Sequence, residues 1–478
     1  MPPIPASTHT ASGIRLEITP ERAFIDDELS VRICGLSPRE IVAVRATTED
    51  DDKREWRSRA TFAADASGIV DIASSESLGG TYRGVSSMGL FWSMHLDEAH
   101  TDGRAIFARK DTAPNRVLLE VEADGRVGRR VAGRVEGQVL VAAQIERNYL
   151  EPGTETRDLK VPTEPGSNSE HGVTHQDTSS REHTIGRLFL PPAAKFRRPL
   201  PAVVVLSGSG GGFDLDKAAV LARHGFATLA LAYFGVPPLP TWLHRIPLDY
   251  FEAAFGWLAA QPEVDSQRIG VLAVSRGAEL ALLLGSMFSQ IRAVVAYAPS
   301  SVAWAAGGRE KESGEIIPSW THRGQPVPFA PLPLRRFIFR SAVPVALLKR
   351  PVMFRDLFRA GLRNGKAISA AEIPVERIRG PILLISGGDD HLWPAAEMSE
   401  RIVARLKKHN FVHPVEHLHY PLAGHMLRYP YLPTTARESR NPHLRGARYS
   451  FGGTPSADAE AQADSWRRAI EFLRTGLQ

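Results

Sequence analysis

The stretch around Ser275 constrains the fold of this chain more than any other, because it joins a strand pattern to a helix pattern. Residues 269–274 are apolar and partly β-branched, as in a buried parallel strand. Residues 278–287 have the Ala/Leu-rich composition of a packed helix. Ala273 and Gly277 are small enough to let strand and helix approach closely around a sharp turn. The stretch therefore predicts a nucleophile elbow, in which Ala273 replaces the first glycine of G-x-S-x-G.

Ser275 also has a purely structural alternative, since serine is a preferred residue at helix N-caps. The pattern small-x-Ser-x-Gly is short and common, so it does not decide between the two roles. A catalytic serine needs a base, an orienting acid and an oxyanion hole. The chain offers a source for each at the expected position, and this favours the catalytic interpretation.

The acid is expected where a later strand ends. Residues 383–390 run from an apolar strand through glycines into Asp389 and Asp390. Open α/β sheets place their sites at this C-terminal edge of the strands. We assign the orienting acid to Asp390, at the G-x-x-D position counted from Gly387, and a helix-cap role to Asp389.

The base is assigned to His425, which follows a predicted strand and a glycine that lets the backbone turn. The resulting chain order, Ser275, Asp390, His425, is that of α/β-hydrolases. A single histidine is more often structural, but three suitable residues in this order, each at a strand end, are hard to obtain by accident. The other candidates lie in or near the strand itself, or too close in sequence to the acid: His413, His417, His419 and His391.

A glycine run at residues 206–213 follows one predicted strand and precedes a helix, the place from which an oxyanion-hole donor comes in this fold. We expect the backbone NH groups of Ser209 and Gly210 to act there together with the NH group of Arg276. Taken alone, the run could cradle a phosphate, but no lysine and hydroxyl pair follows as in a P-loop. No cluster has metal-ligand spacing, so neither a metal nor a cofactor is expected.

The pattern of apolar residues divides the chain into domains. Residues 1–150 show short alternating strands broken by turn residues, which predict an antiparallel β-sandwich. Residues 151–182 are polar and rich in Pro, Gly and Ser, and predict a linker. In residues 183–478 strands alternate with helices, as in a doubly wound parallel sheet. Residues 301–379 fit neither pattern and are predicted to form a lid over the sheet.

An aromatic and glycine-rich stretch at residues 78–94 interrupts the predicted sandwich. Its large apolar side chains must be covered by something. Two alternatives are open: it packs on its own sandwich, or it forms a contact surface that faces the second domain.

Composition limits the partners and the compartment. The chain has 478 residues, a formal charge of +5 and one cysteine, Cys34, in an alternating run that predicts a buried strand position. It shows no signal-like start and no membrane span, so we expect a soluble cytoplasmic protein. Nucleic acid is not expected, because the densest basic region, residues 335–366, interleaves its charges with apolar residues. Such a region is typical of helices over a hydrophobic pocket.

With these residues in place, the chain resembles the family that joins acyl-CoA thioesterases and bile acid-CoA:amino acid N-acyltransferases. Besides the elbow, similar motifs lie at residues 78–85, 88–94, 187–192, 224–233, 249–252, 388–393, 424–425, 452–454 and 461–466. The resemblance implies an immunoglobulin-like domain followed by an α/β-hydrolase domain, and supports Asp390 as the acid. The chain departs from the family pattern at Ala273 and Ala278, which replace glycines, and at Arg276, where lysine is common.

The resemblance also implies a thioester substrate with CoA as carrier. Family members that transfer acyl groups to amino acids tend to carry cysteine at the nucleophile position, whereas Ser275 is the thioesterase choice. We therefore expect hydrolysis of acyl-CoA or a related thioester through an acyl-enzyme on Ser275. The alternatives are transfer of the acyl group to an amine or hydroxyl, and a non-catalytic protein that binds an acyl ligand. The sequence does not specify the acyl chain or whether the thiol carrier is CoA or a carrier protein. It also does not specify the oligomeric state.

Overall fold

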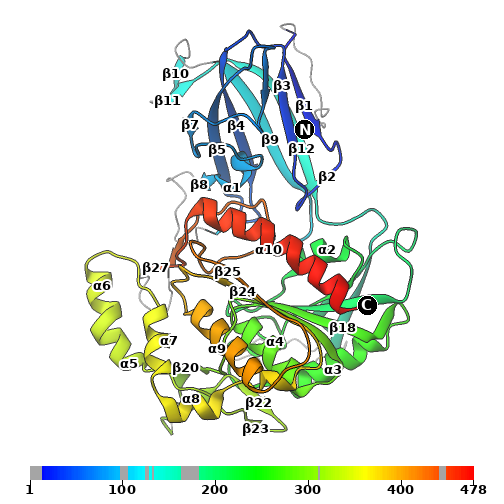
Figure 1. The fold of residues 1–478 in the computed structure, drawn as a ribbon, viewed down its shortest axis with the longest axis vertical. Coiled ribbons are helices and arrows are strands. Elements are labelled where there is room, and N and C mark those ends of the chain that lie inside the picture. Colours follow the sequence, from blue (N-terminus) through cyan, green and yellow to red (C-terminus); the bar gives the residue numbers. More distant parts are fainter. Residues whose placement is uncertain are drawn as a thin grey trace, which may run out of the picture. The chain divides into compact units, whose positions relative to one another are not determined.

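The computed structural model describes residues 13–96, 106–123, 129–131, 134–162, 182–310, 313–440 and 448–478 (Figure 1). The chain divides into two compact units. The first, which we call the sandwich unit, comprises Met1–Leu150, Val345–Val352 and Leu422–Trp466. The second, the α/β unit, comprises Glu151–Pro344, Met353–Pro421 and Arg467–Gln478.

The sandwich unit is built from two sheets, as the alternating residues predict. One sheet has the order β1 (Arg15–Thr19), β3 (Ser30–Cys34), β6 (Ile69–Asp71). The other has the order β2 (Ala23–Phe24), β12 (Val139–Asn148), β9 (Asn115–Ala123), β4 (Ile41–Glu49), β5 (Glu55–Ala63), β7 (Gly79–Gly80), with β8 (His95–Leu96) paired to β5. Buried and half-exposed residues alternate along β5, as in a sheet that covers a core with one face. Cys34 is buried in β3, which confirms its predicted position.

Two hairpins also belong to this unit. They are the hairpin β10 (Arg129–Val131) and β11 (Arg134–Glu136), and the hairpin β26 (Glu438–Arg440) and β27 (Arg448–Ser450). The segment Leu422–Trp466 is tied to the N-terminal part of this unit by specific contacts. Trp466 donates its indole NH to Asp26 at 3.0 Å, and Thr434 donates its backbone NH to the carbonyl of Trp92 at 2.9 Å.

The stretch 78–94 packs on its own sandwich, as the first of the two alternatives predicts. It contains β7 and a single helical turn, α1 (Gly89–Trp92). Ser58 of β5 donates its hydroxyl to the carbonyl of Leu90 at 2.5 Å. A Cβ atom on Gly89 would lie 2.2 Å from the ring of Tyr82, so only glycine fits beneath this aromatic side chain.

The α/β unit is organised around one eight-stranded sheet. Its order is β13 (Glu155–Pro162), β14 (Glu182–Leu190), β16 (Ala227–Leu231), β15 (Leu200–Leu206), β18 (Val264–Val274), β19 (Ile291–Tyr297), β24 (Ile382–Gly387), β25 (Val415–Tyr420). The strands from β16 to β25 are parallel, whereas β14 runs antiparallel to both of its neighbours. Every residue of β16 and β24 is buried, as expected for strands covered on both faces.

The sheet is flanked by α2 (Leu215–Ala222), α3 (Asp249–Ala259), α4 (Arg276–Met287) and α9 (Ala395–Lys408) (Figure 1). The last helix, α10 (Pro455–Gly476), begins in the sandwich unit, and its C-terminal part contacts β18 through Leu473 and Leu477. The chain passes from β15 to β16 on one side and later to β18 on the other side. The strand order therefore reverses at β15, and open sheets place their ligand sites at such a switch point. The loops that follow β15 and β18 are the glycine run and the Ser275 turn.

The predicted polar linker is wrong in part, because residues 155–162 form β13. This strand pairs antiparallel with β14. Its polar side chains are neutralised along the sheet edge: Arg157 lies 3.0 Å from Glu263, and Asp158 lies 2.7 Å from Arg187. Of the other residues predicted as linker, 151–154 form a turn and Glu182 begins β14, whereas residues 163–181 lie outside the described part of the chain.

The region predicted as a lid is an insertion between β19 and β24 that mixes short strands and helices. It contains β20 (Ala305–Arg309), β21 (Ile316–Pro318), β22 (Trp320–His322), β23 (Gln325–Pro326), α5 (Leu334–Phe337), the π-helix Ile338–Ala342, α6 (Val343–Leu347), α7 (Arg355–Leu362), α8 (Gly365–Ala371) and a 3-10 turn, Val375–Arg377. β22 pairs with β17 (Ile246–Pro247). Pro344 explains the π turn, because proline has no amide proton and its ring crowds the carbonyl four residues earlier.

Candidate active site

Ser275 lies in a strained turn between β18 and α4. Its φ of 58° and ψ of −123° are unusual for a residue with a side chain. The turn is held on both sides: the Ser275 amide donates to the carbonyl of Tyr297 at 2.8 Å, and its own carbonyl accepts from Ala278 and Glu279 at 2.9 and 3.0 Å. The serine side chain makes no capping hydrogen bond to α4. The cap alternative is therefore wrong, and the strained serine has the backbone of a nucleophile elbow.

Gly277 lets the helix start directly against the preceding strand. A Cβ atom at this position would lie 2.2 Å from the carbonyl oxygen of Ser207 and 3.0 Å from that of Leu206. Both contacts are with backbone atoms, which cannot rotate away. Glycine is thus required here by the close approach that the sequence predicts.

We expect Gly277→Ala to destabilise the protein by about 1 to 3 kcal/mol, because the new methyl group overpacks the turn against a fixed carbonyl. The measurement is urea unfolding. The matched control is Gly256→Ala in α3, where a Cβ atom would meet nothing within 4 Å. That change should stabilise the protein by about 0.5 to 1 kcal/mol, because Gly256 occupies an exposed position inside the helix. Equal stabilities of the two variants would contradict the assigned role of Gly277.

The glycine run after β15 lies beside Ser275. A Cβ atom on Gly208 would lie 3.3 Å from the Cβ of Ser275. Within the described part of the chain, the amides of Ser209, Gly210 and Arg276 donate no hydrogen bond. Among the described residues, these three NH groups therefore have no acceptor in the fold. The NH groups of Ser209 and Gly210 belong to the loop that borders the serine.

Helix α4 is tied to the insertion by a buried charged pair that the sequence analysis did not single out. Arg276 and Glu279 are 8% and 0% exposed, and their side chains lie 2.7 Å apart. Glu279 also accepts from the Trp320 indole at 2.7 Å and from the Trp304 amide at 3.1 Å. Arg276 in turn donates to the Trp304 carbonyl at 3.1 Å and to the hydroxyl of Ser319.

Burial raises the pKa of Glu279 to about 7, although Arg276 and the two NH donors act in the opposite direction. A signal for this pair was present in the sequence. A glutamate three residues after an arginine, in a helix of otherwise small and apolar residues, must be buried with its partner. The pair fixes the first turn of α4, from which the Arg276 amide projects.

The two carboxylates after β24 have different environments. Asp390 is 1% exposed, and one carboxylate oxygen accepts from the amides of Leu392 and Trp393 at 2.8 and 3.1 Å. The side chain of Asp389 is 41% exposed and lies 3.0 Å from the ring of His391. The cap role predicted for Asp389 is wrong: α9 starts after Pro394, without a side-chain cap. The loop therefore holds Asp390, not Asp389, in a fixed and buried position.

His425 is buried, with 4% exposure, in the loop that follows β25. It belongs to the segment Leu422–Trp466 of the sandwich unit. Its amide donates to the carbonyl of Phe451 at 2.9 Å, and the amide of the preceding Gly424 donates to Asp458 at 2.7 Å. A Cβ atom on Gly424 would lie 2.6 Å from the backbone of Gly452. The backbone of His425 is thus firmly placed in its own unit, and its approach to Ser275 stays a prediction.

Two other histidines occupy structural positions in β25. His417 contacts the hydroxyl of Ser386 at 2.8 Å, and its ring stacks on that of His419 with centroids 5.9 Å apart. Burial lowers the pKa of His417, with the neighbouring His419 acting in the same direction. These contacts agree with the interpretation of both residues as strand residues.

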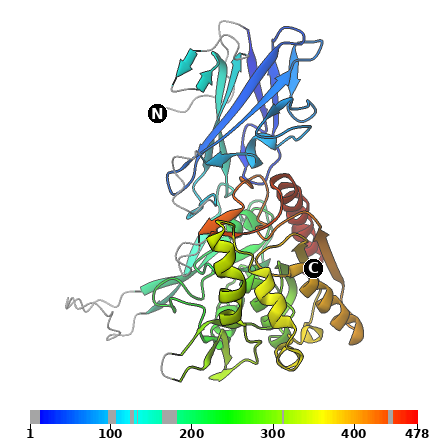
Figure 2. The same ribbon diagram turned by 90° about the vertical axis from the view of Figure 1, so that its left-hand side faces the viewer.

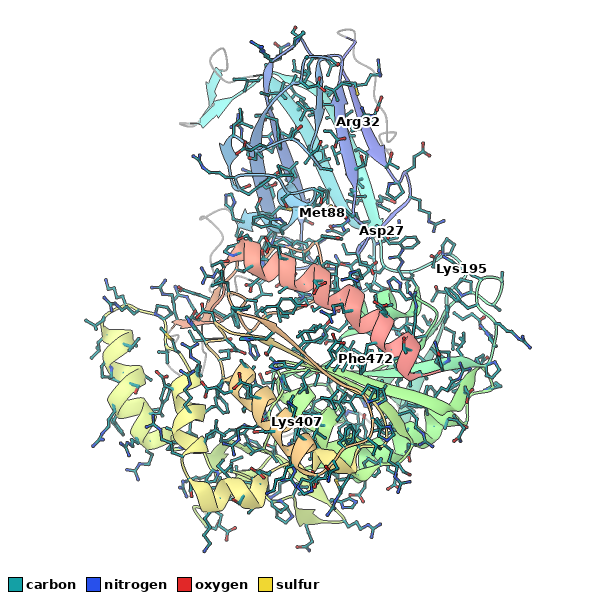
Figure 3. All side chains as sticks on the ribbon, in the orientation of Figure 1. Asp27, Arg32, Met88, Lys195, Lys407 and Phe472 are labelled. Atoms are coloured by element: carbon teal, nitrogen blue, oxygen red, sulfur yellow. The ribbon has the colours of Figure 1, made fainter. Side chains whose placement is uncertain are left out.

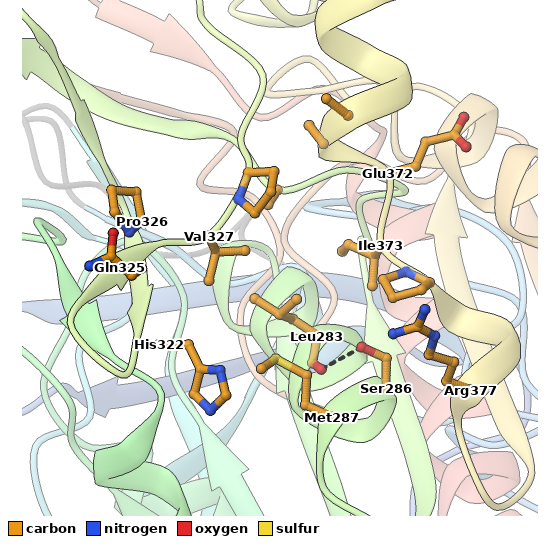
Figure 4. Close-up of a pocket in the computed structure, with 15 residues that line it drawn as sticks. Leu283, Ser286, Met287, His322, Gln325, Pro326, Val327, Glu372, Ile373 and Arg377 are labelled. Carbon is orange, nitrogen blue, oxygen red and sulfur yellow. Dashed lines mark hydrogen bonds between the residues drawn. The ribbon is translucent and has the colours of Figure 1, made fainter.

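A pocket of about 420 Å³ lies toward the far end of α4 from Ser275. Figure 4 shows Leu283, Ser286 and Met287 of this helix facing Val327 and Ile373. At 1.5 Å per residue, Leu283 is about 12 Å along the helix from Ser275. The pocket is therefore separate from the elbow.

Across the described ranges, no group of three or more His, Cys, Asp or Glu side chains could hold a metal ion. In the same part of the chain, no helix is both long and apolar enough to span a membrane.

Comparison with known proteins identifies the family. The family profile described as "BAAT / Acyl-CoA thioester hydrolase C terminal" matches residues 246–478, and the profile "Acyl-CoA thioester hydrolase/BAAT N-terminal region" matches residues 26–161. Mitochondrial acyl-coenzyme A thioesterase 2 of Mus musculus is 32% identical over 98% of this chain and 91% of its own length. This chain belongs to the acyl-CoA thioester hydrolase/BAAT family.

Two further relatives of this chain have names that record different activities. Peroxisomal succinyl-coenzyme A thioesterase of Mus musculus is 30% identical and covers 95% of this chain and 94% of its own length. Acyl-coenzyme A amino acid N-acyltransferase 1 of Mus musculus is also 30% identical and covers 97% and 98%, respectively. One name is that of a thioesterase and the other that of an N-acyltransferase, so the relatives confirm that this chain belongs to a family of enzymes.

Proposed function

We propose that this protein hydrolyses acyl-CoA or related acyl thioesters through an acyl-enzyme on Ser275. The observation that carries the proposal is the strained Ser275 turn, bordered by a glycine loop in which the amides of Ser209 and Gly210 donate no hydrogen bond to any described residue. Such a turn is costly and persists where its strain serves a function. Membership of a thioester hydrolase family supports the substrate class.

The proposed reaction has two steps. His425 takes the proton of the Ser275 hydroxyl, and the serine oxygen attacks the thioester carbonyl carbon. The amides of Arg276, Ser209 and Gly210 donate to the oxyanion. The C–S bond breaks, the thiolate takes the proton from His425, and the acyl group stays on Ser275. Water then gives a proton to His425 and attacks the ester carbonyl carbon. The bond between that carbon and the Ser275 oxygen breaks, the serine oxygen takes the proton back from His425, and the carboxylic acid leaves, while Asp390 keeps the imidazole oriented.

Thiol release from a panel of acyl-CoAs, from short to long chains, tests this function. We expect release at a constant rate without any added acceptor, and a stoichiometric loss of activity when a fluorophosphonate labels Ser275. Failure to release thiol from every acyl-CoA, together with failure to label Ser275, would support the non-catalytic alternative instead.

Acyl transfer is the second candidate, because one relative at 30% identity is named as an amino acid N-acyltransferase. It shares the acyl-enzyme and differs only in the second step, where an amine replaces water. Adding glycine to the assay and measuring amide product distinguishes the two. We expect free acid as the main product, because the nucleophile is serine; product that forms only with the amine would favour transfer.

We expect Asp458→Ala to lower kcat by about 10- to 100-fold, with a smaller change in KM. The loss of the acceptor for the Gly424 amide lets the His425 backbone shift, and a shift of about 1 Å at a catalytic group has an effect of this size. Asp458→Asn keeps an oxygen acceptor and should retain most of the activity. Equal losses in both variants would show that this contact does not position His425.

A further inference from the structure

The insertion carries a long segment of positive charge that the proposed chemistry does not use. Residues 316–355 contain no aspartate or glutamate, although the whole chain has a formal charge of only +5. The same segment contains the basic residues Arg323, Arg335, Arg336, Arg340, Lys349, Arg350 and Arg355. Such a concentration attracts an anionic partner.

The helical part of this segment buries one face and exposes the other. Phe337 and Ala342 are 6% and 4% exposed, and the Phe337 ring lies 5.7 Å from that of Phe354. On the outer face, Phe339 is 71% exposed and Val343 is 43% exposed. The prediction that this basic region covers a hydrophobic pocket is therefore wrong for Phe339, whose side chain points into solvent. An aromatic residue held in solvent is a reason to look for a partner.

Basic side chains surround this exposed aromatic ring. A surface hollow of about 320 Å³ is lined by Arg335, Arg336, Phe339 and Arg340. Among the described residues, none of the three arginines lies within ion-pair distance of a carboxylate. Figure 1 shows α5 and the adjoining turn at the left edge of the α/β unit, and Figure 2 views this helix from that side. The guanidinium groups are thus exposed together with the ring.

We propose that the face formed by Arg335, Arg336, Phe339, Arg340 and Val343, here called the arginine face, docks on an anionic phospholipid surface. The arginines contact lipid phosphates, and Phe339 and Val343 enter the boundary between headgroups and acyl chains. A basic helix with exposed aromatic and aliphatic side chains has the composition of a segment that lies in this interface. The next residues, Leu347 and Leu348, are 78% and 68% exposed and extend the same composition.

A bilayer fits these residues better than a free phosphorylated ligand. A soluble anion would use the guanidinium groups but leave the phenyl ring of Phe339 in water. A lipid surface satisfies both, because phosphate and hydrocarbon lie within a few ångströms of each other. The inference does not depend on the proposed hydrolysis, since docking requires no reaction at Ser275.

Co-sedimentation of the full chain with vesicles tests the inference. We expect binding to vesicles of phosphatidylcholine and phosphatidylserine, weakened by salt, and little binding to phosphatidylcholine alone. Each arginine near an anionic surface contributes about fivefold to binding, so the triple variant Arg335→Gln/Arg336→Gln/Arg340→Gln should bind about 100-fold more weakly. Phe339→Ser should lower the affinity for these vesicles by about tenfold or more, because it removes the inserted ring.

The matched control removes three exposed positive charges elsewhere in the same unit: Arg377→Gln/Lys407→Gln/Lys408→Gln. Lys407, labelled in Figure 3, lies on α9. This variant should bind like the wild type. Equal weakening in both triple variants would overturn the inference in favour of general charge attraction. Equal binding to neutral vesicles would also overturn it.

A free nucleotide site is the remaining outcome. If added CoA displaced the protein from vesicles, and the triple variant at the arginine face raised KM for acyl-CoA, the face would be a CoA site and the membrane proposal would fall. Ser275→Ala should bind vesicles like the wild type. A failed vesicle experiment and a failed hydrolysis experiment are therefore distinguishable.

Discussion

Replacing Ser275 with alanine is expected to lower kcat/KM for thiol release from acyl-CoA by about a thousandfold or more. The variant removes the oxygen that forms the acyl-enzyme and leaves only binding and the oxyanion donors. The Cβ atom is kept at the same φ of 58°, so the backbone turn keeps its steric environment. Stopped assays of CoA release with wild type and variant at matched concentration measure the effect.

The control for this prediction is stability. The free energy of unfolding of Ser275→Ala should lie within about 0.5 kcal/mol of the wild-type value, because the turn is held by backbone hydrogen bonds to Tyr297, Ala278 and Glu279. A folded Ser275→Ala protein that still releases CoA at the wild-type rate would remove the proposed mechanism. A folded protein that binds acyl-CoA without releasing CoA would be the expected result.

Ser275→Cys separates hydrolysis from transfer. A thiol nucleophile gives a thioester intermediate in place of an oxygen ester. The rate of attack by an amine, relative to the rate of attack by water, is higher for a thioester than for an oxygen ester. We expect the variant to form more amide product per free acid than wild type when glycine is added. An unchanged ratio would show that the acceptor site, rather than the nucleophile, decides the outcome.

The sequence predicted the elbow because its requirements are local. Strand, turn and helix are encoded by consecutive residues, and the small size of Gly277 is demanded by the nearby carbonyl of Ser207. The position after an apolar strand predicts Asp390 as the acid, and its burial and its two backbone donors distinguish it from Asp389. The assignment of His425 depends on an approach between distant segments, which no local pattern encodes.

What the sequence did not predict arises from pairings across the chain. Residues 155–162 look like a linker because they are polar, and they form a strand because Arg157 and Asp158 find ion-pair partners in other segments. The insertion has no single periodicity, since a proline forces a π turn and short strands alternate with short helices. Phe339 belongs to the basic region that the sequence predicts over a hydrophobic pocket, and only the burial of Phe337 and the exposure of Phe339 show that this ring points outward.

Glu279 carries the second large effect, on the free energy of unfolding. Glu279→Ala is expected to destabilise the protein by about 3 to 5 kcal/mol, because it leaves the guanidinium of Arg276 buried without its carboxylate. The indole of Trp320 and the amide of Trp304 lose their acceptor as well. Urea unfolding measures the loss. The double variant Arg276→Met/Glu279→Leu should recover part of it, because it removes both charges; no recovery would show that the pair does not act as a unit.

The pH dependence identifies the titrating group. The pKa of Glu279 is raised from 4.5 to about 7 in the folded protein, so between these values the native state binds more protons than the unfolded state. Stability from this group is therefore fully present below the unfolded pKa and falls as pH rises to about 7, by up to about 3 kcal/mol. Glu279→Gln cannot titrate, so its unfolding free energy should fall less than that of the wild type over this window. Parallel pH profiles would show that the carboxylate stays ionised throughout, held by Arg276 against the cost of burial.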